Sequence, residues 1–120
     1  MEKTDAALLR GLKRLTKGLQ FQSESDYPVE PFALDSWKPG ADARAVDFDN
    51  FFAAATEEQD WHDADARARV RKFQALVKFL KENLADVQVF KVGDTESDVY
   101  VVGRTASGNF AGVKTKVVET

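Results

Sequence analysis

A long amphipathic helical pattern followed by three strand patterns is the feature that most limits how this chain can fold. Within residues 64–84, apolar side chains recur at alternating steps of three and four: Ala66, Val70, Phe73, Val77, Leu80 and Leu84. This spacing is typical of a helix that packs on a sheet. Segments 87–92, 98–104 and 110–118 are rich in β-branched residues and are separated by glycine-containing turns. We therefore predict a long helix followed by three antiparallel strands.

The first third of the chain predicts a second helix and an irregular strand. Leucines between positions 8 and 19 follow helical spacing, with Thr4 as a possible N-cap and Gly18 as a stop signal. Residues 27–34 suit an edge strand, because their two prolines cannot donate backbone hydrogen bonds. A serine-rich ordered loop is expected before this strand.

The middle of the chain predicts a loop and a short helix. Residues 38–45 read as a turn or short loop, and Asp47 or Asp49 can cap the helix that follows. The order of helix, strand, helices and three-stranded meander indicates the α+β class, with helices covering a mainly antiparallel sheet. With neither an internal repeat nor a linker, residues 1–120 are predicted to form a single domain.

Composition excludes several kinds of chemistry. At 120 residues and 43% hydrophobic content, the chain can bury a core without disulfides. It has no cysteine and one histidine, His62, which rules out thiolate zinc sites, cysteine nucleophiles and sites that need two histidines. The net charge of −3 disfavours nucleic-acid binding. No segment approaches the roughly 20 apolar residues of a membrane span, and no signal peptide is evident, so we expect a cytoplasmic protein without membrane contact.

The end of the sequence combines several oxygen donors. Only Glu119 and Thr120 follow the last apolar pair. A strand paired almost to its final residue would hold a terminal carboxylate, a hydroxyl and a glutamate in a fixed direction at the rim of the sheet. We therefore expect this end to be usable as a ligand.

Six short stretches resemble one known family. They are FQSESDYP at 21–28, VDFDNFF at 46–52, QDW at 59–61, KFQAL at 72–76, DVYVVG at 98–103 and TKVVET at 115–120. The chain is similar in these stretches to the inhibitors of sugar-non-specific nucleases, the nuclease A inhibitor-like proteins. Segment 35–45 is shorter than the corresponding loop of a typical member.

The resemblance implies an α/β/α sandwich that plugs the active site of a metal-dependent, sugar-non-specific DNA/RNA endonuclease. It implies no catalysis, no direct nucleic-acid contact, a monomer when free, and no cofactor other than the magnesium that the nuclease supplies. By motif, Thr120 reaches that magnesium, Glu24 pairs with a basic active-site residue, and Trp61 is a further contact.

These residue types suit those roles. Magnesium prefers hard oxygen ligands, and Thr120 offers both a carboxylate and a hydroxyl. Glu24 lies between Ser23 and Ser25, whose hydroxyls can bond the nearby backbone and stiffen the loop. Opposite an arginine, Glu24 could form a bidentate pair. The alternatives are that Glu24 is a solvated loop residue, or that one of the serines caps a short turn.

Trp61 has two interpretations, an exposed interface anchor or a side chain folded back over the start of the long helix. The oxygen and imidazole donors around it also allow a metal site, and with it a metal-assisted hydrolase: Asp60, His62, Asp63 and Asp65. Their spacing fits no known mechanism, and Asp63 is better suited to capping the helix.

Two other groups of residues are predicted to be structural. The basic run Arg67, Arg69, Arg71 and Lys72 points in several directions on a helix, which favours a solvated face with local ion pairs. Seven aromatic residues are spaced like core contacts: Tyr27, Phe32, Phe48, Phe51, Phe52, Phe73 and Phe79. A further functional alternative is a binding module of the same fold whose partner is not a nuclease.

Overall fold

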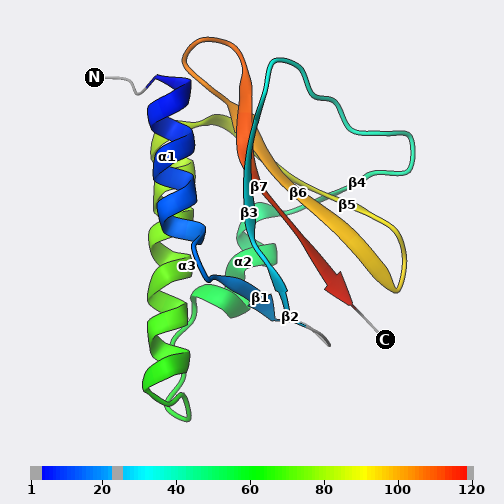
Figure 1. Cartoon of the computed structure of the whole chain (residues 1–120). Helices are drawn as coiled ribbons and strands as arrows, with labels where there is room; N and C mark the ends of the chain where they lie inside the picture. The colour runs from blue at the N-terminus through cyan, green and yellow to red at the C-terminus, as the bar shows by residue number, and fades with distance from the viewer. Residues whose placement is uncertain (1–3, 23–25, 119–120) are drawn as a thin grey trace.

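The computed structural model describes residues 4–22 and 26–118, and shows helices beside a twisted sheet (Figure 1). In chain order the elements are α1 (Asp5–Thr16), β1 (Gln20–Gln22), β2 (Asp26–Pro28), β3 (Glu30–Leu34), β4 (Arg44–Val46), α2 (Phe48–Thr56), α3 (Ala64–Asn83), β5 (Ala85–Val92), β6 (Glu96–Arg104) and β7 (Phe110–Val118). The predicted α+β class is confirmed.

The main sheet has five antiparallel strands in the order β3-β7-β6-β5-β4. Val89, Val101 and Val113 lie opposite one another across its three central strands and are buried toward the helices. Strands β1 and β2 form a separate two-stranded ribbon. The three predicted consecutive strands are therefore present, and the predicted edge strand is β3.

All three described helices contribute to one core on one face of the sheet. Leu12 from α1, Phe52 from α2 and Leu76 from α3 are buried in the same cluster as the inward valines of the sheet. This confirms the predicted helical cover. On the opposite face, Trp37 from segment 35–43 packs against the strands, with its ring centroid 5.2 Å from that of Phe90. An α/β/α sandwich would have a second layer of helices on this face.

Each helix begins at a capping side chain that the sequence indicates. The oxygens of Thr4, Asp47 and Asp63 accept hydrogen bonds of 3.2, 2.9 and 2.8 Å from the backbone N–H three residues further on. Of the two aspartates that could cap α2, Asp47 therefore does so. After α1, Gly18 adopts a left-handed φ of 71°, which confirms the predicted stop.

Two short elements differ from the sequence prediction. Residues 44–46 form strand β4 where a loop was predicted, because they pair with the outer edge of β5. The Arg44 guanidinium supports this position by donating to the carbonyl of Gly93 at 2.7 Å. The predicted edge strand 27–34 begins only at Glu30, because Tyr27 pairs instead with Phe21 in the ribbon of β1 and β2, part of which lies where a loop was predicted.

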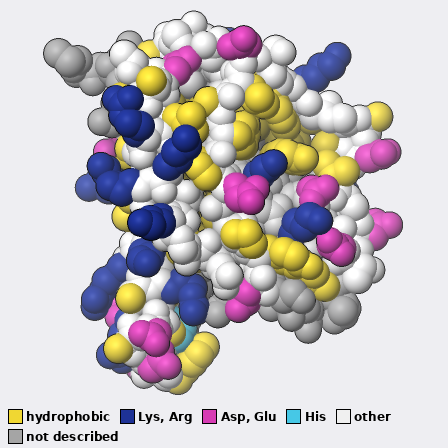
Figure 2. Space-filling model, in the orientation of Figure 1, with side chains coloured by type: hydrophobic (Ala, Val, Ile, Leu, Met, Phe, Trp, Pro, Cys, Tyr) yellow, Lys and Arg dark blue, Asp and Glu magenta, His cyan; other side chains and the backbone are white. Residues whose placement is uncertain are grey.

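Opposite charges alternate across the outer face of the sheet (Figure 2). Lys114 lies 3.9 Å from Glu30, and Lys116 lies 3.1 Å from Glu96. The hydrogen bond that the Lys116 amine donates to Glu96 raises the pKa of this lysine. Paired charges of both signs do not make the basic surface that nucleic acid needs. Among the described residues, no helix is long and apolar enough to cross a membrane.

Candidate partner-binding site

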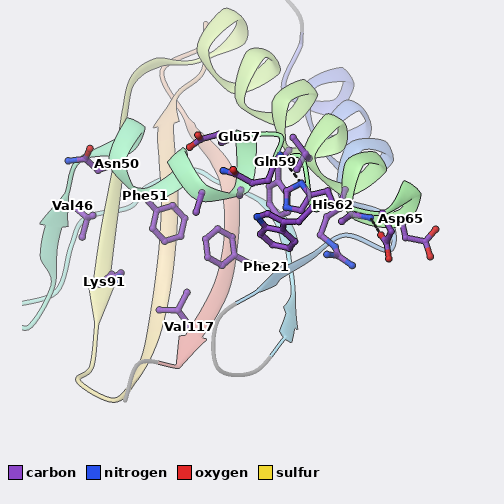
Figure 3. A pocket seen from close by; sticks show the side chains of 18 residues that line it. Phe21, Val46, Asn50, Phe51, Glu57, Gln59, His62, Asp65, Lys91 and Val117 are labelled. Atoms are coloured by element: carbon purple, nitrogen blue, oxygen red, sulfur yellow. Dashed lines mark hydrogen bonds between the residues drawn. The ribbon is translucent and has the colours of Figure 1, made fainter.

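An open groove of about 1010 Å³ lies between α2, the beginning of α3 and one end of the sheet (Figure 3). Seven parts of the chain line it: β1, β4, α2, the 57–63 segment, α3, β5 and β7. Elements far apart in the sequence therefore meet at this surface. It is a concave feature of the size that binding sites occupy.

Aromatic rings form the floor of the groove. Phe21 from β1 stacks on Phe51 from α2, with ring centroids 4.7 Å apart and planes 11° apart. Its edge also meets Phe73 of α3, whose ring is fully within the core. Because the lowest ring belongs to the core, the half-buried rings of Phe21 and Phe51 above it are held in fixed positions.

Trp61 projects from the loop at one side of this groove. Its side chain is 80% exposed, which decides between the two interpretations: the ring is not folded back over α3. The loop beneath it is held by two hydrogen bonds of 3.1 Å, from the Gln59 N–H to His62 Nδ1 and from the His62 N–H to the Gln59 carbonyl. An exposed indole on a hydrogen-bonded loop is typical of an interface anchor.

Two of the possible metal ligands around Trp61 instead accept hydrogen bonds from the nearby backbone. His62 Nδ1 accepts from Gln59, and Asp63 accepts from the N–H of Ala66 at the start of α3. Within residues 4–22 and 26–118, no three His, Asp or Glu side chains gather in a way that could hold a metal ion. The geometry of the described loop gives the hydrolase alternative no support.

The basic run on α3 divides into two kinds of residue. Arg67 and Arg71 lie 3.6 and 3.9 Å from Glu58, which confirms the predicted local ion pairs. Arg69 instead lines the groove and is half-buried. Within the part of the chain that the structure describes, Arg69 makes no ion pair.

Five of the sequence-predicted contact residues lie outside the described residues: Ser23, Glu24, Ser25, Glu119 and Thr120. The described residues next to these two segments lie close together. The ribbon of β1 and β2 lies beside the final part of β7 (Figure 1), and Thr115 Oγ1 donates to the Pro28 carbonyl at 3.0 Å. Phe21 and Val117, each two positions before one of these segments, line the same groove as Trp61.

Comparison with known proteins identifies the family. The sequence model described as nuclease A inhibitor-like protein matches residues 6–120. The chain belongs to this family. No curated protein gives a significant match to the chain. Membership of a nuclease inhibitor family suggests an inhibitor and implies a nuclease as its partner.

Sequence reasoning missed part of the groove. Phe51 was assigned to packing, yet it is only half-buried and lines the groove. Arg69 was assigned to a solvated face, although it lies one helical turn from both Ala66 and Phe73 and so borders the apolar stripe of α3. This spacing separates it from Arg67 and Arg71, and the packing of α3 beside α2 makes that border part of the groove.

Proposed function

We propose that this chain inhibits a metal-dependent, sugar-non-specific endonuclease by covering its active site. The covering surface is the end of the molecule formed by the ribbon of β1 and β2, the end of β7 and the Trp61 loop. The observation that supports this most directly is that Phe21, Val117 and Trp61 line one groove. Trp61 is one of the residues that the family resemblance assigns to the nuclease contact. Phe21 and Val117 lie two positions before the segments that carry the others.

Thr120 supplies the contact with the metal in this proposal. A carboxylate and a neighbouring hydroxyl can replace water on a magnesium ion that the nuclease holds, where a substrate phosphate would otherwise bind. The inhibitor then needs no cofactor of its own. Glu119 beside it adds a negative charge near the same cation.

Glu24 supplies the second polar contact. A carboxylate opposite a nuclease arginine makes a bidentate, charge-assisted pair, which is stronger at the dry centre of an interface than at its wet rim. The hydroxyls of Ser23 and Ser25 favour a stiff loop that presents this carboxylate. The net charge of −3 suits approach to the basic surface on which a nuclease binds nucleic acid. We further propose that the free inhibitor is a cytoplasmic monomer.

The test is a titration of the protein against magnesium-dependent, sugar-non-specific endonucleases while cleavage of DNA and RNA is followed. Wild-type protein should abolish cleavage at an equimolar ratio. Deletion of Thr120 and the substitution Glu24→Gln should each raise the concentration for half-inhibition about tenfold or more, since each removes a central interface contact.

The matched control is Glu82→Gln, at the opposite end of α3 from the Trp61 loop, where Glu82 lies 3.9 Å from Lys78 of the same helix. It should inhibit as wild type does. If the wild-type chain leaves every such nuclease active and recovers other proteins instead, the chain is a binding module with a different partner. If it inhibits but is indifferent to both changes, the magnesium contact is wrong.

A further inference from the structure

The contacts proposed for Glu24 and Thr120 act through oxygen atoms, whereas much of the lining of the groove is apolar. We infer that this groove is a second anchoring site, which receives an apolar side chain from a surface loop of the partner nuclease. This inference rests on the proposed function and adds to it an apolar component of recognition.

The lining of the groove fits an apolar side chain. The stacked rings of Phe21 and Phe51 form its floor, and the buried Val70 extends this floor along α3. Small side chains on the two facing helices leave the space open: Ala54, Ala55 and Ala66. An aliphatic or aromatic side chain placed here would lose its contact with water and gain contact with rigid rings.

The rim of the groove carries the residue types that most often dominate interface energy. Trp61 is 80% exposed and has most of its apolar area still to bury. Arg69 is half-buried and has no ion-pair partner among the described residues, whereas its neighbours Arg67 and Arg71 share Glu58. Its guanidinium can donate to backbone carbonyls of an incoming loop.

Position and charge favour the nuclease over a second copy of this chain. Phe21 and Val117 line the groove and lead directly into the segments that carry Glu24 and Thr120. A nuclease held at those segments must therefore lie next to the groove. Two copies of a chain with net charge −3 repel each other, whereas the basic surface on which a nuclease binds nucleic acid is attracted to it.

The test uses the absence of cysteine from the chain, which makes any introduced thiol unique. Ala54 and Ala53 are adjacent and exposed on α2, but only Ala54 lines the groove. Alkylation of Ala54→Cys and Ala53→Cys is timed with and without an endonuclease that the wild-type chain inhibits. We expect the complex to slow alkylation at position 54 about tenfold or more, and to leave position 53 within about twofold.

Equal alkylation at the two positions, in a complex that no longer cleaves DNA, would overturn the groove inference while leaving the inhibitor function intact. Protection of position 54 at high concentration of the chain alone would indicate a second copy as the occupant, and would also overturn it. If no endonuclease is inhibited, the proposed function itself has failed.

A second pair of variants gives an independent result. Ala54→Trp fills the groove, whereas Ala53→Trp adds the same ring outside it, and circular dichroism checks that both proteins stay folded. We expect Ala54→Trp to raise the half-inhibition concentration about tenfold, with Ala53→Trp close to wild type. Equal inhibition by the two tryptophan variants would contradict the inference.

Discussion

A single carboxylate joins the first helix to the turn before the last strand. Asp5, in the first turn of α1, accepts hydrogen bonds from Asn109 Nδ2 at 2.7 Å and from Ser107 Oγ at 2.8 and 2.9 Å. These bonds, that from Asn109 above all, lower the pKa of the Asp5 carboxyl below its usual 3.8. The contact links residues more than 100 positions apart in the sequence.

The lowered pKa makes the contribution of Asp5 dependent on pH. A carboxyl whose pKa is lower in the folded state stabilises the fold above its unfolded pKa, and this stabilisation is lost as the pH falls through the folded pKa. We expect Asp5→Asn to lower the urea midpoint at pH 7, and the deficit to shrink below about pH 4. Asp42→Asn, at a loop aspartate with no hydrogen bond among the described residues, is the control. A deficit that is constant from pH 7 to pH 3 would contradict this account.

The two tryptophans should respond differently to removal. Trp61 is exposed beside the groove, whereas Trp37 is half-buried against Phe90 and Tyr100. We expect Trp61→Ala to weaken nuclease inhibition about tenfold while changing the free energy of unfolding by less than about 0.5 kcal/mol. Trp37→Ala should lower the free energy of unfolding, because packing is lost, and should leave nuclease inhibition nearly unchanged. Inhibition assays and urea unfolding of both variants decide this, and the prediction fails if Trp61→Ala affects stability alone.

At the scale of the elements, close approach of β6 and β7 depends on a glycine. A Cβ at Gly112 would overlap the carbonyl oxygen of Val101 and lie 2.8 Å from its carbonyl carbon. Since backbone atoms cannot turn aside as a side chain can, the central strand pair would have to shift. We expect Gly112→Ala to lower the free energy of unfolding by about 2–3 kcal/mol. Gly40→Ala, where a Cβ would meet nothing within 4 Å, should leave the unfolding midpoint nearly unchanged.

Elements with strong internal signals could be predicted from the sequence. Helix α3 has both a capping aspartate and an apolar stripe, and its observed bounds agree with the prediction to within one residue. Strand β7 agrees at both ends, because turn residues precede it and β-branched residues fill it. Strand β4 could not be predicted, since three residues carry little preference and its pairing with β5 decides its conformation.

Less of the candidate site than of the fold could be predicted from the sequence. The exposure of Trp61 depends on how the 57–63 loop is bonded to itself, and the sequence left both orientations open. The groove requires Phe21, Phe51 and Val117 to meet, and they belong to three separate elements. Local periodicity cannot show such a meeting. The contacts assigned to Glu24 and Thr120 stay predictions.

At the scale of the whole molecule, the two ends of β7 have different surroundings. Its first residues adjoin the start of α1 through the hydrogen bonds of Asp5, and its last residues adjoin the ribbon of β1 and β2 (Figure 1). The described chain therefore begins at one end of the molecule, and its proposed inhibitory surface lies at the other.

This arrangement predicts that the position of a fusion tag matters. A peptide tag of about ten residues before Met1 should leave nuclease inhibition unchanged, because α1 begins far from the groove. The same tag after Thr120 should weaken inhibition about tenfold or more, because it removes the free carboxylate from the proposed contact. Cleavage assays at matched concentrations compare the two. Full inhibition by the protein that carries the tag after Thr120 would rule out the metal contact, whereas loss of inhibition in both would point to a general effect of tagging.

The two outer strands of the sheet also bear on how the protein behaves at high concentration. Strand β3 contains Pro31, which has no N–H to offer, and strand β4 is only three residues long. Short or proline-containing borders are poor templates for adding strands from neighbouring molecules. The borders of the five-stranded sheet thereby guard the fold against the edge-to-edge pairing that leads to amyloid-like aggregation.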